Sequence, residues 1–169
     1  MIKAVVICED HRLDEYLIKP VIEQIFTEHD RKVRVTFAPR TLVRGIAQAL
    51  QKSKHSEVFE RYGMAHSFFL IVDRDCDSHR EHGKFADRLA DAKEADKMMF
   101  GCLAIEELEV WALALHRRSG DFNWDNVRSD CHPKENFFIP FIENQKWQTS
   151  PGRGRKAAVA NLSPQDGMR

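Results

Sequence analysis

The feature that most constrains the fold is a run of five apolar residues, Phe68 to Val72, that ends abruptly at Asp73. A continuous apolar run of this length, with no polar alternation, is typical of a strand buried on both faces in the interior of a parallel sheet. Parallel strands need crossover connections, which are usually helices. The run therefore predicts an α/β fold.

The rest of the chain alternates short apolar runs with longer helical patterns. We expect further strands at residues 2–8, 33–37 and 99–105, and helices at residues 13–26, 41–50 (capped by Thr41), 81–98 and 108–115. Beyond Gly120 the signal weakens: residues 133–147 look helical, although Pro140 interrupts them. This alternation predicts an α/β layered fold around a mostly parallel sheet.

Length and composition limit the class of protein. A chain of 169 residues is the size of one domain, and we expect a core at residues 1–118 with a helical and loop extension at 119–169 packed on it. No apolar run approaches the roughly 18–20 residues of a membrane span, and the first nine residues do not form a signal peptide. Four singly scattered cysteines indicate reduced thiols, so the expected location is cytoplasmic. The 26 basic and 26 acidic residues cancel, so any contact with nucleic acid must come from local patches.

Acidic residues follow three of the expected strands. They are Glu9 after the first strand, Asp73, Asp75 and Asp77 after the central strand, and Glu106, Glu107 and Glu109 after the last strand. Ligands of open parallel sheets gather outside the carboxyl ends of the strands, where these side chains would converge. Converging carboxylates repel one another unless a hard divalent cation such as Mg²⁺ or Mn²⁺ lies between them. Two such ions could support cleavage of a phosphodiester bond.

Simpler interpretations of these acids remain open. Glu9 alone could be a helix cap or a solvated turn residue, and the three glutamates could form the acidic first turn of a helix. A calcium-binding EF-hand loop would need Gly and Glu where Ser78 and Lys84 stand. Zinc is a weaker alternative, because Cys76, His79 and His82 supply only one end of a site.

A basic, glycine-rich segment lies near the end of the chain. Its cationic residues are Arg153, Arg155 and Lys156, and it lacks the spacing of a Walker A phosphate loop. Taken alone, it is better interpreted as a flexible basic loop. Beside an acidic metal site, it could instead clamp a nucleic-acid backbone.

Three segments together resemble the Toprim domain of topoisomerases, bacterial primases and OLD-type (overcoming lysogenization defect) nucleases. They are residues 6–10 with 14–17, residues 69–77, and residues 104–111. The resemblance is closest to a small, stand-alone Toprim-like family of bacterial proteins whose members often look like partners of ATPases in phage-defence loci. It covers roughly residues 2–115 and implies a Rossmann-like, three-layer fold with a central sheet of about four parallel strands.

The resemblance also implies roles for individual residues. Glu9 matches a strand-end glutamate that acts as metal ligand or general base, and Asp73 and Asp75 match the paired aspartates that bind metal and complete the catalytic set. Asp77 would assist metal binding from the outer coordination sphere. Glu109, and with it Glu106, matches an acidic residue that precedes a tryptophan on the helix after the last strand. Asp10 departs from the pattern, because many Toprim proteins have Gly there.

The sequence thus predicts a Mg²⁺-dependent phosphodiester-processing enzyme, a nuclease acting on DNA or RNA. The alternative is a non-catalytic Toprim-like module that binds an ATPase partner or nucleic acid. A third interpretation, a small-molecule phosphohydrolase, would need an enclosed pocket. The sequence leaves the oligomeric state open.

Overall fold

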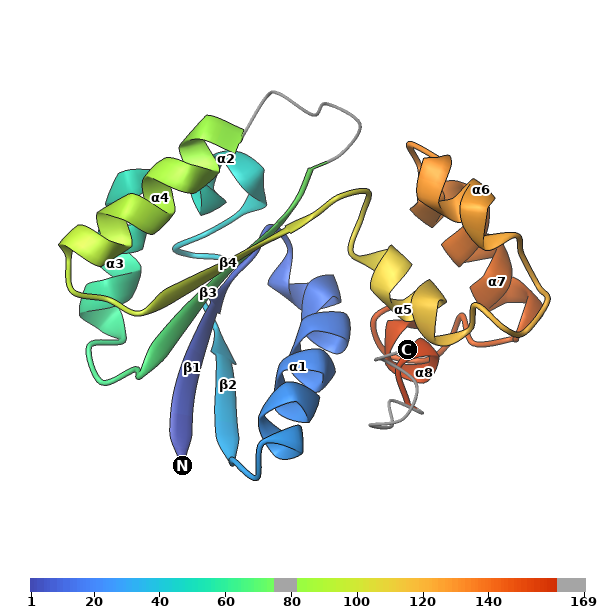
Figure 1. Cartoon of the computed structure of the whole chain (residues 1–169), viewed down its shortest axis with the longest axis horizontal. Helices are drawn as coiled ribbons and strands as arrows, with labels where there is room; N and C mark the ends of the chain where they lie inside the picture. The colour runs from blue at the N-terminus through green and yellow to red at the C-terminus, as the bar shows by residue number, and fades with distance from the viewer. Residues whose placement is uncertain (75–81, 161–169) are drawn as a thin grey trace.

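The computed structural model of the chain describes residues 1–74 and 82–160. It contains a four-stranded, entirely parallel sheet in the order β2-β1-β3-β4 (Figure 1). The strands are β1 (Ile2–Ile7), β2 (Val33–Phe37), β3 (Ser67–Asp73) and β4 (Met99–Ala104). Each observed strand ends within one residue of its predicted bounds, and the predicted α/β class with a mostly parallel sheet of about four strands is confirmed.

The helices follow the strands in chain order. They are α1 (His11–Glu28), α2 (Gly45–Ala49), α3 (Lys52–Arg61), α4 (His82–Glu94), α5 (Glu109–Leu115), α6 (Trp124–Ser129), a π-helical turn η1 (Lys134–Phe138), α7 (Ile139–Asn144) and α8 (Arg155–Ala158). The predicted cap at Thr41 is wrong, because α2 begins only at Gly45 and Arg44 occupies the N-cap. Pro140 lies in the first turn of α7, directly after the π-helical turn η1.

Helices cover both faces of the sheet, which makes three layers (Figure 1). On one face α1, α5 and the C-terminal helices share a core that runs from Leu17 through Phe138 to Val159. On the other face α2, α3 and α4 pack against alternate residues of the same strands, including Ile7 and Leu70. Because all four strands are parallel, their carboxyl ends lie at a single edge of the sheet.

The cysteines differ from the sequence-based expectation. Cys8 and Cys102 are free thiols, as expected, but Cys131 is disulfide-bonded, so the prediction that all four are reduced is wrong. Cys76 lies outside the described residues. Within residues 1–74 and 82–160, no helix is both long and apolar enough to cross a membrane.

Candidate metal centre at the carboxyl edge of the sheet

The candidate site lies at the carboxyl ends of the two central strands. β1 and β3 are neighbours, with Ile7 in register with Leu70. Asp73 is the last residue of β3, and Glu9 follows the end of β1 by two residues. Both side chains are half-buried. The parallel sheet therefore brings together two of the acids that the sequence places at separate strand ends.

Glu9 and Asp73 are in direct contact. The backbone N–H of Asp73 donates a hydrogen bond of 3.1 Å to Oε1 of Glu9. The backbone carbonyl of Glu9 accepts a second hydrogen bond of 2.9 Å from the N–H of Gly45. Asp73 Oδ1 in turn accepts one of 3.0 Å from the N–H of Leu108, the residue that precedes α5. These bonds fix both carboxylates relative to the sheet.

Two further carboxylates lie at the start of α1. Asp10 is the N-cap residue, and its side chain accepts a hydrogen bond from the N–H of Arg12. The N–H of Asp10 donates to Oδ2 of Asp14 at 3.1 Å, so the two aspartates cap the helix reciprocally. Sequence reasoning did not nominate Asp14, although its spacing of four residues from a strand-end aspartate was a usable signal.

Burial and nearby carboxylates together raise the pKa of two groups at this edge. Burial raises the pKa of Asp14 to about 6, and the nearby Glu109 carboxylate adds to the effect. Burial also raises the pKa of the Cys8 thiol well above its ordinary value, and the carboxylates of Asp14, Asp10, Glu9 and Asp73 raise it further. For both groups burial is the largest cause, and nearby carboxylates act in the same direction.

The glutamates that follow β4 are engaged elsewhere. Glu106 Oε1 accepts a hydrogen bond of 3.0 Å from Nε of Arg128, and the two form an ion pair. Glu107 Oε2 accepts one of 2.8 Å from the backbone N–H of Lys134, while burial raises the pKa of its carboxyl. Both side chains therefore tie the end of β4 to the C-terminal helices.

The sequence predicts Glu109 as a metal ligand and Arg155 as a contact to nucleic acid. In the structure these two side chains bind one another. The two side chains form a short ion pair and are only 5% and 4% exposed, respectively. Arg155 also donates to the carbonyl oxygen of Gly152 at 2.9 Å, and its guanidinium lies over the ring of Phe138. The pair joins α5 to α8 inside the protein, which leaves Arg155 buried rather than exposed as a clamp for a nucleic-acid backbone.

The other two residues of the basic segment point to solvent. Arg153 and Lys156 are exposed, on either side of the buried Arg155. Lys156 lines a small hollow of about 320 Å³ together with residues of α1, among them Tyr16 and Pro20. Only these two of the three predicted phosphate contacts are therefore at the surface.

Several predicted ligands cannot be placed. Asp75, Cys76, Asp77 and His79 lie outside the described residues, as does the side chain of His82. Within the described ranges, no group of three or more His, Cys, Asp and Glu side chains is positioned to hold a metal ion.

Arg74 is a basic residue of this edge that sequence reasoning did not nominate. It directly follows Asp73, and its backbone N–H donates to the carbonyl oxygen of Ala104 at 2.9 Å. Its side-chain Nε is buried and has no hydrogen-bond partner within the described residues. Its place between Asp73 and Asp75 in the sequence was the signal that could have identified it.

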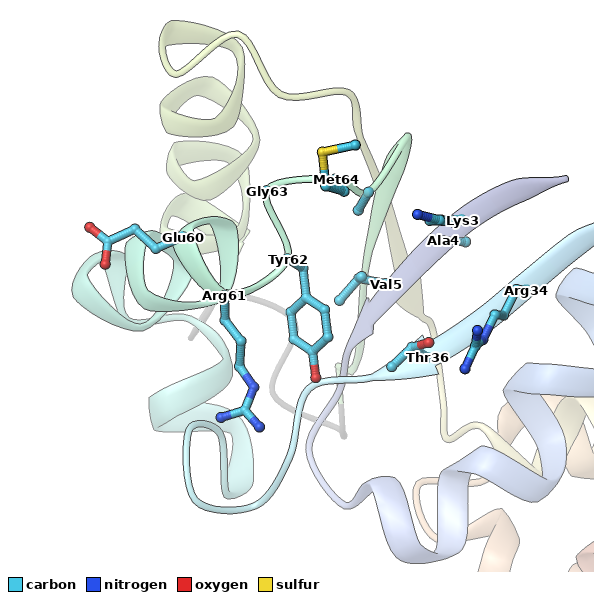
Figure 2. Close-up of a pocket in the computed structure, with 11 residues that line it drawn as sticks. Lys3, Ala4, Val5, Arg34, Thr36, Glu60, Arg61, Tyr62, Gly63 and Met64 are labelled. Atoms are coloured by element: carbon cyan, nitrogen blue, oxygen red, sulfur yellow. The ribbon is translucent and has the colours of Figure 1, made fainter.

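A larger hollow lies elsewhere on the sheet. It has a volume of about 660 Å³ and is lined by residues of β1, β2 and the end of α3, including Lys3, Arg34, Arg61 and Tyr62 (Figure 2). Lys3 lies near the amino end of β1, so this hollow is separate from the acidic edge. Comparison of the chain with protein-family models, curated proteins and solved structures found no match.

Proposed function

We propose that the chain is a metal-dependent phosphodiester-processing enzyme, a nuclease that acts on DNA or RNA with Mg²⁺ or Mn²⁺. The observation that carries the proposal is the direct contact between Glu9 and Asp73 at the carboxyl edge of the central strands. This is the place where open parallel sheets bind their ligands. The resemblance of the surrounding segments to Toprim domains supports the same assignment.

The chemistry of the donor set fits a hard cation. Glu9 and Asp73 offer only carboxylate oxygens, which suit Mg²⁺ and Mn²⁺ better than softer metals. Burial is the main cause of the raised pKa of Asp14 and of Cys8, and nearby carboxylates add a repulsion that a bound cation would relieve. Glu9 and Asp73 would hold the ion, together with Asp75 from the adjoining segment. A bound Mg²⁺ would polarise a phosphoryl oxygen and lower the pKa of a coordinated water.

The protein's own residues have separate tasks in this proposal. The hydrogen bond from the Asp73 N–H orients the Glu9 carboxylate, which acts as ligand or as base toward the attacking water. Arg74, Arg153 and Lys156 supply positive charge for phosphates. Glu109 and Arg155 take neither of the roles expected from the sequence, because their ion pair secures α8 against α5.

The test is a cleavage assay with supercoiled plasmid, single-stranded DNA and RNA, each incubated with EDTA, Mg²⁺ or Mn²⁺. Wild-type protein is compared with Asp73→Asn and with Asp87→Asn, an exposed aspartate of α4 that serves as the matched control. We expect metal-dependent cleavage that Asp73→Asn abolishes and Asp87→Asn retains. Equal activity in wild type and Asp73→Asn would refute the assignment.

A second candidate is a non-catalytic module that binds an ATPase partner or nucleic acid. The pairing of Glu106 with Arg128 and of Glu109 with Arg155 favours it, because both glutamates are withdrawn from metal coordination. This candidate predicts no cleavage under any of the metal conditions. It also predicts that Mg²⁺ leaves the melting temperature unchanged.

A further inference from the structure

Within residues 1–74 and 82–160, one edge of the sheet has no neighbouring strand. β2 pairs only with β1 among the described strands, and the pairing is parallel. At the two ends of this pair, the N–H of Ile2 donates to the carbonyl oxygen of Lys32, and the N–H of Ala38 donates to that of Val6, both at 2.8 Å. In a parallel ladder, alternate residues bond the same neighbour. Even-numbered residues of β2 therefore bond to β1, and the odd-numbered ones point their N–H and C=O groups outward. Of these groups, the C=O of Phe37 accepts a long hydrogen bond of 3.5 Å from the hydroxyl of Tyr62, which the added strand would replace.

The outward groups face a groove. Its volume is about 590 Å³, and it runs along β2 against one side of α1. The residues that α1 contributes are spaced four apart on one stripe of the helix: His11, Glu15, Lys19 and Glu23. An open strand edge beside a polar helix stripe is a surface suited to the addition of another strand.

We propose that the occupant of this edge is β2 of a second copy of the chain, paired antiparallel about a twofold axis at Val35. In this register Val35 meets its own copy, Val33 meets Phe37, and Arg34 meets Thr36. The odd-numbered residues, whose N–H and C=O groups point outward, then lie directly opposite one another, as a hydrogen-bonded antiparallel pair requires. Valine beside valine or phenylalanine is a favourable cross-strand pair.

The same axis makes the charges on α1 complementary. The groove is lined by the α1 stripe, by β2 and by Met1 and Pro39. Because α1 leads from the carboxyl end of β1 back to the start of β2, it runs antiparallel to β2 (Figure 1), and the middle of its stripe lies near the middle of that strand. A twofold axis there places α1 antiparallel to its copy. Glu15 then faces Lys19 of the second copy, and His11 faces Glu23 of the second copy. When the stripe lies beside a reversed copy of itself, an acid stands opposite each base. A second copy of the chain therefore fits this surface better than an unrelated peptide does.

Other registers of the same strand fit less well. An axis at Arg34 would place two guanidinium groups opposite one another, which is unfavourable. An axis at Thr36 would leave Val33 without a partner inside the strand. An axis that lies between two residues would place each odd-numbered residue opposite an even-numbered one, whose N–H and C=O groups point toward β1. No ladder of hydrogen bonds would then form.

On the face of the joined sheet that lies away from α1, the dimer brings basic side chains of the two copies closer together. Lys3 and Arg34 line the hollow shown in Figure 2, and the dimer would bring the hollows of both copies side by side. The two Arg34 side chains lie diagonally across the axis and not opposite one another, because each faces Thr36. This spacing limits their repulsion, and the α1 face supplies the attraction that outweighs it.

The test measures the mass of the full chain by sedimentation equilibrium over a dilution series. We expect a dimer whose dissociation constant rises at least about tenfold in Glu15→Lys and in Lys19→Glu, which is about 1.4 kcal/mol. The double variant Glu15→Lys/Lys19→Glu restores opposite charges across the axis and should recover most of the affinity. Glu94→Lys, on α4 at the other face, should have no effect.

A backbone variant tests the strand pairing separately. Val33→Pro removes an outward N–H that β1 does not use, so the fold should persist while the dimer dissociates. Circular dichroism and a thermal scan check that the variant is folded. The proposal is overturned if wild type is monomeric at its highest soluble concentration. It is also overturned if the double charge variant stays as weak as the single ones, or if folded Val33→Pro dimerises normally.

Discussion

The backbone N–H of Asp73 donates a hydrogen bond to the carboxylate of Glu9, residues that lie at the ends of two adjacent parallel strands. The bond orients one acid by the main chain of the other, without a side chain between them. Such main-chain positioning is rigid, because both donor and acceptor strands are buried in the centre of the sheet. Replacing either acid by its amide, which has the same shape, therefore removes the charge while the hydrogen bond can remain.

Glu9→Gln should abolish the effect of metal while preserving the fold. The glutamine oxygen can still accept the hydrogen bond from the Asp73 N–H, but the negative charge that favours a cation is lost. We expect the melting temperature in EDTA to stay close to that of wild type and the increase caused by Mg²⁺ to disappear. Differential scanning calorimetry with and without Mg²⁺ measures both quantities. An undiminished Mg²⁺ effect in Glu9→Gln would contradict the assignment of Glu9 as a ligand.

Removing one partner of the Glu109–Arg155 pair should destabilise the protein strongly. Each single variant, Glu109→Gln or Arg155→Met, leaves a buried charge uncompensated, which costs about 3–5 kcal/mol of unfolding free energy. The double variant Glu109→Leu/Arg155→Met should recover most of this loss, since an apolar pair of similar volume removes both charges. Urea denaturation gives the three values.

Arg153→Ala and Lys156→Ala provide the matched controls for Arg155. Both side chains are exposed, and we expect their replacement to change the unfolding free energy by less than about 0.5 kcal/mol. Any effect of these two variants should instead appear in nucleic-acid binding. A small stability change in Arg155→Met would show that the buried pair is not the main attachment of α8.

Asp14→Asn should stabilise the protein at neutral pH. Burial raises the pKa of Asp14 from 3.8 to about 6, so the folded state holds this proton more tightly than the unfolded state does. The resulting stability is present below pH 4 and is lost as the pH rises through about 6. The difference between the two pKa values sets an upper limit of about 3 kcal/mol. Because the side chain is partly exposed, we expect a gain of about 1–2 kcal/mol in the variant.

The measurement for Asp14→Asn is urea denaturation in EDTA at several pH values. The gain should be present at pH 7.5 and vanish near pH 4, since the wild-type carboxyl is then protonated. The asparagine oxygen can still accept the hydrogen bond from the Asp10 N–H. A gain that is independent of pH would point to packing rather than to ionisation.

Gly154→Ala should be much more costly than Gly120→Ala. Both glycines have a positive φ, of 91° and 81° respectively, so alanine pays a similar backbone penalty of about 1–2 kcal/mol at either position. A Cβ at Gly154 would overlap the side chain of Ile142, whereas nothing lies within 4 Å of one at Gly120. We expect an additional loss of about 1–3 kcal/mol at Gly154, measured by urea denaturation. Equal losses would mean that Ile142 can move aside freely.

The strands were predictable because each is a short segment that is continuously apolar, as in β3, or alternates apolar and polar residues, as in β2. α3 was missed, since its sequence is mostly polar and its buried residues, His55, Val58 and Phe59, are too few to mark a helix. The start of α2 was misplaced, because Thr41 resembles a cap although the chain turns again before Gly45. Local patterns thus identify elements that bury a whole face and fail for elements whose position depends on neighbouring helices.

The candidate site, too, was predictable from the sequence only in part. Strand ends carry acids in the sequence, and the order of the strands brings Glu9 and Asp73 together. The pairing of Glu109 with Arg155 depends instead on a turn near Gly154 that directs an arginine of a glycine-rich segment inward. Charge and glycine content alone suggested a mobile, exposed loop. Only the packing of α8 against α1 and α5 reveals its structural role.

The shared core of α1 and α8 has a consequence for synthesis of the chain. Leu17 of α1 belongs to the same apolar cluster as Ala158 and Val159, which are translated about 140 residues later. Until the segment containing Arg155 emerges, Glu109 on the nascent chain has no counter-ion and α1 lacks part of its cover. The sheet can assemble earlier, but the domain reaches its full stability only after the residues up to Val159 have been translated.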